Sequence, residues 1–375
     1  MINRRTLLKT AAKHALLLPA IAMSNQLAHA SADVLKNFML CAKNPDGDFV
    51  GIKLNEKGII SQQFKLQERG HGQAVSILGD IAIFARRPNN QLYLIDRMGR
   101  LKVHYAPEGR HFFGHGVFSN DGKLLYCSEN DYDNEDVHKT GVIGVWDVIK
   151  GAKIGEFLSG GIGVHEIKLM PDGETLAIAN GGILTHPDQP RRKLNLASMR
   201  PNLSFVNRKT GDLITSISLP KALHQLSIRH IDVSNHSEVA VAMQYKGNKN
   251  DDVPLVAIAT KYAKLKFVNM PQQILKHNRQ YIGSIAFDKS GKYFAATSPR
   301  GHQVCFYNRD GEYISQYKMD DICAITATKN ANEFIFASGM GHIRSFNVDN
   351  LQLKNIHIQT AKMPLLQWDN HMTLL

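Results

Sequence analysis

The sequence predicts an all-β protein with a single seven-bladed β-propeller over residues 31–375. Short apolar segments separated by turn residues continue along the whole chain after residue 34. A unit of such segments also recurs at intervals typical of four-stranded propeller blades. The two ends of the chain offer complementary parts of one further blade, which sets the blade number at seven.

Individual segments have the composition of strands. Residues 81–85, 91–96 and 101–105 form one set, rich in β-branched and aromatic residues and bounded by Gly, Asn, Asp and Pro. These are strand and turn signals, and no later stretch sustains the 3.6-residue period of a long helix.

The repeat is clearest at the start of each predicted inner strand. The residues at this position are His71, His115, His165, His230, Ser284, Cys323 and Gln367. Their separations are 44, 50, 65, 54, 39 and 44 residues, and the longest interval contains an insertion at 181–199.

The last blade is predicted to join both ends of the chain. Residues 365–369 form a lone inner strand, and residues 37–42, 49–54 and 59–66 form three strands without an inner partner. Their union removes an exposed sheet edge. A β-sandwich with extra strands does not explain a repeat that spans the chain.

Residues 1–30 predict a twin-arginine signal peptide. Arg4 and Arg5 precede a short apolar stretch, and residues 28–30 (Ala-His-Ala) offer a cleavage site. A short membrane anchor is the alternative, but the stretch is too short to span a bilayer. We therefore expect a periplasmic protein without a transmembrane segment after cleavage.

Charge and cysteine content restrict the partners. Without residues 1–30 the formal net charge falls from +12 to +8, because two Arg and two Lys leave and no acid does. An exported basic protein favours an anionic ligand, metal complex or envelope protein over nucleic acid. The widely spaced cysteines exclude CxxC and CxxCH sites, and we expect four buried, unpaired thiols at Cys41, Cys127, Cys305 and Cys323.

Four of the inner-strand residues are histidines, so a ring of imidazoles is predicted at one mouth of the channel. Imidazole binds transition metals, and a carboxylate could complete such a site. The predicted metal ligands are His71, His115, His165, His230, Glu129 and Asp131. The alternative is that each histidine only bonds a neighbouring blade.

A second group of residues is predicted on the same face, because the turns between the second and third strands lie beside the starts of the inner strands. The predicted ligand-binding residues are Arg86, Arg87, Arg229, Arg300, Arg191, Asn180, His186 and Gln244. Guanidinium groups suit carboxylate or phosphate. Pairing with Glu129, Asp131 and Glu166 inside the protein is an equally good explanation.

The sequence resembles an uncharacterised family, a domain of unknown function found in twin-arginine-exported propeller proteins encoded near imelysin-type, iron-regulated proteins. Segments that carry the resemblance are 86–88 (RRP), 114–118 (GHGVF), 129–132 (ENDY), 179–183 (ANGGI) and 298–301 (SPRG). The resemblance implies the same fold, an envelope location and, by genomic neighbourhood alone, iron or haem handling.

Three functions remain open from the sequence. The first is a periplasmic binding or accessory protein that takes a metal, an iron chelate, haem or another anion at the mouth. The second is an enzyme, either a lactonase-like hydrolase or an oxidoreductase with a partner-supplied cofactor, although GxSxG, HExxH and P-loop motifs are absent from the sequence. The third is a scaffold that docks an envelope protein.

Overall fold

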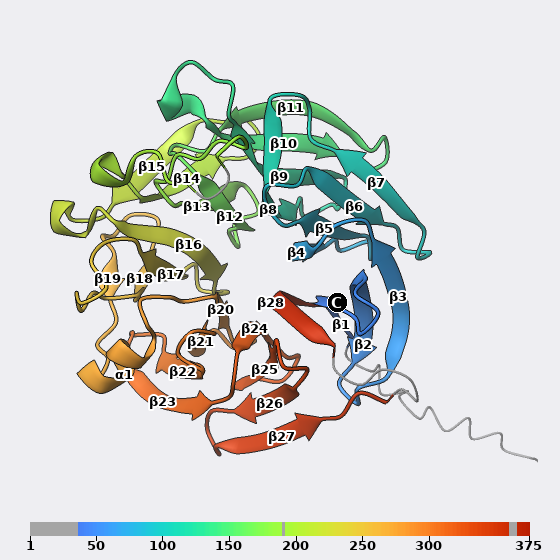
Figure 1. Ribbon diagram of the computed structural model, residues 1–375, viewed down its shortest axis with the longest axis vertical. Coiled ribbons are helices and arrows are strands. Elements are labelled where there is room, and N and C mark those ends of the chain that lie inside the picture. Colours follow the sequence, from blue (N-terminus) through green and yellow to red (C-terminus); the bar gives the residue numbers. More distant parts are fainter. Residues whose placement is uncertain (1–36, 190–191, 360–365) are drawn as a thin grey trace, which may run out of the picture. The chain divides into compact units, whose positions relative to one another are not determined.

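A computed structural model describes residues 37–189, 192–359 and 366–375. The predicted signal peptide lies outside the described residues. The described chain forms seven four-stranded antiparallel sheets arranged around a central axis (Figure 1). This confirms the predicted seven-bladed β-propeller.

The first four blades, each given from its innermost to its outermost strand, begin with the blade shared by the chain ends. That blade contains β28 (Gln367–Leu374), β1 (Asn37–Lys43), β2 (Phe49–Asn55) and β3 (Ile60–Leu66). The second contains β4 (Gly70–Val75), β5 (Ile81–Ala85), β6 (Gln91–Ile95) and β7 (Leu101–Tyr105). The third contains β8 (Arg110–Phe118), β9 (Leu124–Asp131), β10 (Gly141–Asp147) and β11 (Ala152–Leu158). The fourth contains β12 (Val164–Leu169), β13 (Thr175–Asn180), β14 (Asn202–Asn207) and β15 (Leu213–Ser218).

The other three blades follow the same order. The fifth contains β16 (Leu226–Val233), β17 (Val239–Tyr245), β18 (Val256–Ala259) and β19 (Lys266–Phe267). The sixth contains β20 (Ser284–Phe287), β21 (Tyr293–Ser298), β22 (Gln303–Asn308) and β23 (Tyr313–Lys318). The seventh contains β24 (Ile322–Ala327), β25 (Glu333–Ser338), β26 (Ile343–Asn347) and β27 (Gln352–Ile356). Short helices are α1 (Gln272–His277) and the 3-10 turns Val137–Lys139, Leu196–Ser198 and Lys221–Leu223.

The blade shared by the two ends forms as predicted. Strand β1 pairs antiparallel with β28, placing Phe38 opposite Leu374 and Lys43 opposite Gln367. The C-terminal strand runs to Leu374, five residues beyond the predicted end at Asp369. This difference matters for the site, because the added residues include His371.

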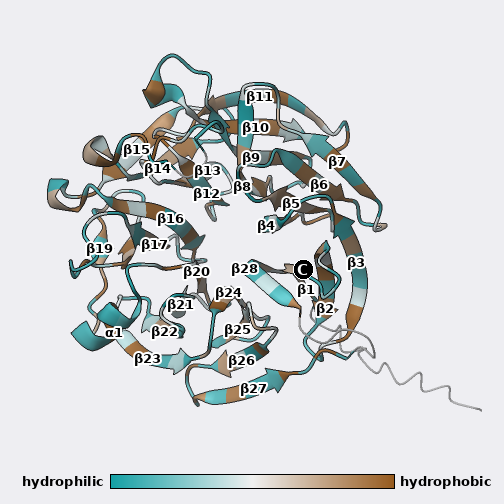
Figure 2. Cartoon of the chain, viewed as in Figure 1, coloured by the Kyte–Doolittle hydropathy of each residue, from teal (hydrophilic) through white to brown (hydrophobic). Residues whose placement is uncertain are grey.

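Hydrophobic side chains fill the space between blades. The middle strands are buried on both faces, as in β5, where all five residues are buried. Outer strands alternate with exposed residues, as in β15, and β28 at the centre is coloured mainly hydrophilic (Figure 2). The four cysteines are buried and unpaired, which confirms that prediction.

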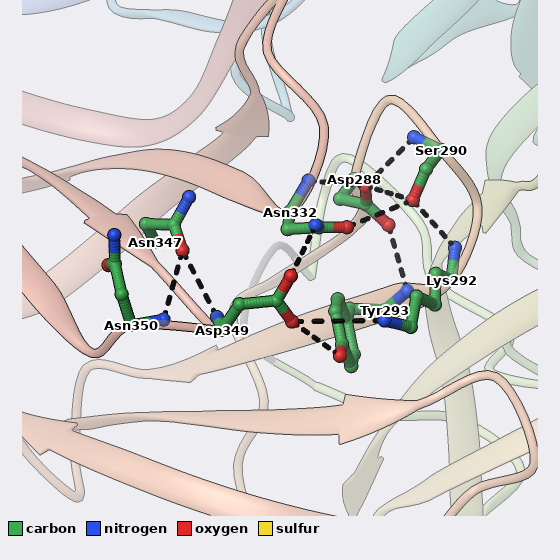
Figure 3. A network of polar contacts seen from close by, with 8 residues as sticks. All are labelled: Asp288, Ser290, Lys292, Tyr293, Asn332, Asn347, Asp349 and Asn350. Carbon is green, nitrogen blue, oxygen red and sulfur yellow. Dashed lines mark hydrogen bonds and ion pairs between the residues drawn. The ribbon is translucent and has the colours of Figure 1, made fainter.

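Polar turns tie neighbouring blades together on the face opposite the starts of the inner strands. Asp288 in the β20–β21 turn accepts hydrogen bonds from the backbone N–H of Ser290 and of Asn332 in the next blade, both at 2.8 Å. The Tyr293 hydroxyl and the Asn332 amide donate to Asp349, each at 2.6 Å (Figure 3). These bonds satisfy the turn backbone and fix the blade spacing. No helix in the described residues is long and apolar enough to cross a membrane.

Candidate functional site

Five histidines meet in the central channel. The four predicted ones lie on four inner strands, His71 on β4, His115 on β8, His165 on β12 and His230 on β16. The fifth, His371, comes from β28. The ring centroids of His71 and His115 are 4.9 Å apart, and those of His71 and His371 are 4.6 Å apart.

The rings form a closed pattern with His115 in contact with all the others. Its centroid lies 4.9, 4.9, 5.4 and 4.7 Å from those of His71, His165, His230 and His371. Those four make a ring among themselves, with successive separations of 6.0, 4.7, 4.6 and 4.6 Å. The five ring centroids are therefore connected like the corners of a square pyramid, in which His115 is the apex and the other four histidines form the base.

Irregular strand pairing directs these side chains to the channel. Register shifts occur in β4 between Gly70 and Gln73, in β8 between Phe112 and Gly116, and in β12 between Val164 and Ile167. The bulge in β16 leaves Arg229 without an opposite residue between Ile228 and His230, and Asp369–His371 are likewise unpaired with β1. Bulges next to sites re-aim side chains in this way.

Two glycines allow the rings to approach each other. A Cβ on Gly72 would lie 2.3 Å from the carbonyl oxygen of Gly114 and 2.7 Å from His115 Nδ1. A Cβ on Gly114, whose φ is +99°, would lie 2.6 Å from the ring of His71. The Gly-His-Gly sequences therefore provide the space in which His71 and His115 meet.

Two buried carboxylates contact the outer side of the cluster. Glu166 lies 3.1 Å from His230 Nδ1 and 3.7 Å from His115 Nδ1. Burial raises the pKa of Glu166, but Lys168, His115 and His230 outweigh burial and hold that pKa well below its usual range. Lys168 in turn lies 3.2 Å from Asp232.

The second carboxylate is Asp369. It lies 3.8 Å from His71 Nδ1 and accepts a hydrogen bond from Arg69. Burial raises its pKa, but His71 and Arg69 bring the pKa of Asp369 down to about 2. Both carboxylates are therefore anionic at neutral pH.

Burial favours the neutral form of four of the five imidazoles. Burial lowers the pKa of His71, His115, His165 and His371, and the neighbouring histidines lower it further, whereas Asp369 raises the pKa of His71 and Glu166 raises that of His115 without outweighing burial. Neutral imidazole is the form that binds metals. His115 Nε2 and His371 Nε2 are buried without a hydrogen-bond partner in the described chain.

A cavity of about 370 Å³ opens above the histidines. His71, His165 and His230 lie at its base, whereas His115 and His371 line a smaller cavity of about 60 Å³ deeper in the channel. Seven basic residues line the upper cavity, namely Arg86, Arg87, Arg192, Lys193, Arg229, Lys246 and Arg300. None of its described lining residues is Asp or Glu.

Uncharged partners hold several of these cations. Arg87 donates to the Thr185 hydroxyl at 3.0 Å, and the Arg300 guanidinium lies 4.3 Å above the Tyr281 ring. Lys246 donates to the side chain of Gln244 at 2.9 Å. These basic side chains are therefore held in place without an acidic partner among the described lining residues.

Burial and neighbouring positive charges lower the pKa of two basic residues in the cavity. Burial, then Arg229 and other cations, lower the pKa of Lys246 to about 6. Burial and Arg87 lower the pKa of Arg229 to about 10. An anion in the cavity would relieve this repulsion.

Four of the predicted residues line neither cavity. Glu129 bonds Trp146 at 3.0 Å and Lys153 at 2.7 Å, because its side chain is directed into the blade. Asp131 instead pairs with Arg110 at 3.1 Å. Neither belongs to the close groups of metal-ligand atoms, which consist of histidines alone.

Asn180 and His186 do not line the cavity either. Asn180 lies between Ser159 and Ser204, at 2.8 and 2.9 Å. The His186 ring packs 5.3 Å from that of Tyr132. Arg191 lies outside the described residues, whereas Gln244, Arg86, Arg87, Arg229 and Arg300 do line the cavity.

The site also contains residues that the sequence interpretation missed. His371 lies beyond the predicted end of its strand, although it belongs to an inner strand as the other four do. Arg192 and Lys193 lie in the predicted insertion next to Arg191. Lys246 follows Gln244 by two residues and carried no separate signal.

Fold and site together define a class of protein, a seven-bladed propeller with a cationic cavity above a histidine cluster. The chain belongs to the family described as "Protein of unknown function (DUF1513)", which matches residues 64–375. No curated protein matches the sequence.

Solved structures share the fold. A chain of hydrazine synthase from Kuenenia stuttgartiensis aligns with a TM-score of 0.58 and 15% identity, covering 90% of this chain and 99% of that one. A chain in the crystal structure of a mitotic checkpoint complex aligns with a TM-score of 0.55 and 12% identity, covering 76% and 78%. At such identities the likeness concerns the fold alone.

Proposed function

We propose that this protein is a binding protein for a small polyanion, a molecule with several carboxylate or phosphate groups, held in the cationic cavity. The observation that carries the proposal is the lining, with seven basic side chains and no acidic one among the described residues. In the periplasmic setting predicted by residues 1–30, such a ligand would be a captured solute or an anionic metal chelate.

The unpaired state of the buried cations supports this proposal. Arg229 is 8% exposed, and its Nε has no hydrogen-bond partner in the described chain. A guanidinium buried without a counter-ion is costly. The alternative raised from the sequence, pairing with internal acids, does not apply to the cavity, because Glu129 and Asp131 pair with Lys153 and Arg110.

The dimensions favour a small molecule. Pockets for small ligands have volumes of about 300–1,000 Å³, and this one, at about 370 Å³, is near the lower limit. Arg86, Arg192, Lys193 and Arg300 form an exposed rim, whereas Arg229 and the partly buried Lys246 lie deeper. Exposed cations would attract the anion, and the deeper ones would bind it after desolvation.

Calorimetric titration with citrate and with pyrophosphate tests the proposal. We expect one anion of this class to bind with 1:1 stoichiometry. Arg229→Gln should weaken binding about 10- to 100-fold, because a charge-assisted hydrogen bond contributes about 1.5–3 kcal/mol. Arg97→Gln, at an exposed arginine outside the cavity, should leave affinity unchanged. Absence of binding by both anions, or equal affinity in Arg229→Gln, would refute the proposal.

A further inference from the structure

We infer that the five channel histidines form a binding site for one divalent first-row transition-metal ion, with His115 as the axial ligand. Two groups of three histidines already bring ligand nitrogens within 4.8 Å of one another, His71–His115–His371 and His115–His165–His230. The two groups share His115, and the His115 ring lies within 5.4 Å of the other four ring centroids, so we place the ion between the five rings.

The ring spacing agrees with coordination around a common ion. An imidazole nitrogen binds such a metal at about 2.1 Å, which places adjacent ring centroids about 4.5 to 5.3 Å apart at octahedral or tetrahedral angles. Six of the eight close pairs fall between 4.6 and 4.9 Å. The His115–His230 pair, at 5.4 Å, and the His71–His165 pair, at 6.0 Å, need small ring shifts.

The hydrogen-bond pattern leaves nitrogen atoms for a metal. His115 is 5% exposed and His371 is 7% exposed, yet Nε2 of each has no hydrogen-bond partner among the described residues. A histidine that only bonded a neighbouring blade would use these atoms, since buried polar groups are nearly always paired. Their position beside three other imidazoles indicates a ligand.

Glu166 and Asp369 supply the outer contacts that metal-binding histidines need. Glu166 faces Nδ1 of both His115 and His230, which leaves Nε2 of those rings for the ion. A carboxylate behind a ligating imidazole fixes its orientation and raises its basicity. The two buried carboxylates also offset the positive charge that the ion would bring close to the cationic cavity.

The donor set defines the class of metal. Five imidazoles without a thiolate suit Zn²⁺, Cu²⁺, Ni²⁺, Co²⁺ or Fe²⁺, whereas Ca²⁺ and Mg²⁺ prefer oxygen ligands. The side of the pyramid opposite His115 faces the upper cavity, because His71, His165 and His230 line that cavity and His115 does not. If the proposed anion binds there, it would meet the open coordination position; this last step rests on the proposed function.

Titration of the metal-stripped protein with Co²⁺, followed by visible absorption and without any added polyanion, tests the metal site. We expect one equivalent to bind, with the weak d–d bands of five- or six-fold coordination. His115→Ala, at the residue that contacts all four other rings, should weaken binding at least 100-fold. His342→Ala, at an exposed histidine outside the channel, should bind as the unaltered protein does.

Controls separate loss of ligands from loss of fold. If His115→Ala does not fold, by circular dichroism, His371→Gln replaces it and should weaken Co²⁺ binding by at least 10-fold. Binding that survives both substitutions, or no Co²⁺ binding by the folded protein, overturns the inference. The outcome is independent of citrate and pyrophosphate binding, so failure of the metal site and failure of the anion site are distinguishable.

Discussion

The Oε2 atom of Glu166 lies 3.1 Å from Nδ1 of His230, and the same oxygen accepts a hydrogen bond from the backbone N–H of Ile231 at 3.1 Å. Its other oxygen lies 3.7 Å from His115 and 3.5 Å from Lys168. Glu166 thus connects the inner strands of three blades, β8, β12 and β16, at the level of the histidines.

Removing the charge of Glu166 should loosen the cluster. In Glu166→Gln we expect metal affinity to fall about 10- to 100-fold, as for other changes behind metal-bound histidines. We also expect the free energy of unfolding to fall by about 1–3 kcal/mol, since a buried charged hydrogen bond is lost. Co²⁺ titration and urea unfolding measure the two effects. The control Glu174→Gln changes an exposed acid and should shift the free energy of unfolding by less than about 0.5 kcal/mol. Equal decreases in the free energy of unfolding for the two variants would contradict this role of Glu166.

A methyl group at position 72 should separate two of the rings. In Gly72→Ala the new Cβ would meet the Gly114 carbonyl at 2.3 Å, so the backbone must move. We expect a loss of about 1–3 kcal/mol in the free energy of unfolding, as for other overpacking changes, together with weaker Co²⁺ binding. Gly155→Ala is the matched control, because nothing lies within 4 Å of a Cβ there. A Gly72→Ala protein as stable as this control would show that the close approach is dispensable.

Anion binding should tighten as the pH falls toward 6 and level off below it. The pKa of Lys246 is lowered to about 6, mainly by burial and then by Arg229, so its amine is largely neutral in the free protein above that pH. An anion favours the charged form, so binding above pH 6 takes up a proton and weakens as the pH rises. Sulfate, whose charge is constant in this range, is the probe for titrations between pH 5 and 8. Lys246→Met should reduce the pH dependence of sulfate affinity. An unchanged pH dependence in that variant would show that another group takes up the proton.

The lowered pKa of Lys246 also makes the stability of the ligand-free protein depend on pH. Because the folded pKa of Lys246 lies below its value of 10.5 in the absence of structure, the unfolded chain binds more protons between about pH 6 and 10.5. Lys246 therefore makes the free energy of unfolding increase with pH across this window. Urea unfolding at pH 7 and pH 9 should show a smaller increase in Lys246→Met than in the unaltered protein.

The four thiols should be inert in the folded protein. Burial raises the pKa of Cys41 and of Cys305 to about 12, and raises that of Cys127 and Cys323 as well. Thiolate is the reactive form, so an aromatic disulfide reagent should label none of the four until the chain is unfolded in denaturant, and then all four. Rapid labelling of a thiol in the native protein would contradict the buried arrangement.

The fold was predictable because each blade produces the same local sequence pattern of short strands and turn residues. Turn residues and alternating strands recur from residue 37 to the C-terminus, and the unmatched strands at the two ends required a shared blade. The insertion at 181–199 was predicted from the long interval between His165 and His230, and it does contribute Ile183, Thr185, Arg192 and Lys193 to the cavity.

The site was only partly predictable, because strand direction locates a residue at a mouth but does not say where its side chain is directed. His71 and Glu129 were both assigned to the same face, yet Glu129 turns into its blade toward Trp146 and Lys153. His371 was missed because the strand boundary was placed too early, and strand ends are the least certain feature of a sequence pattern. Lys246 acquires its role from burial among cations, which no local pattern records.

The central claim is that the mouth of the propeller is a binding site, with an anion above and a metal below. A crystal structure of the protein grown with citrate and Co²⁺, with anomalous data at the cobalt edge, tests it most directly. The account predicts one anomalous peak bounded by the five histidines and citrate density against Arg229 and Lys246. A channel without cobalt and a cavity without citrate, in crystals grown at saturating concentrations of both, would contradict it.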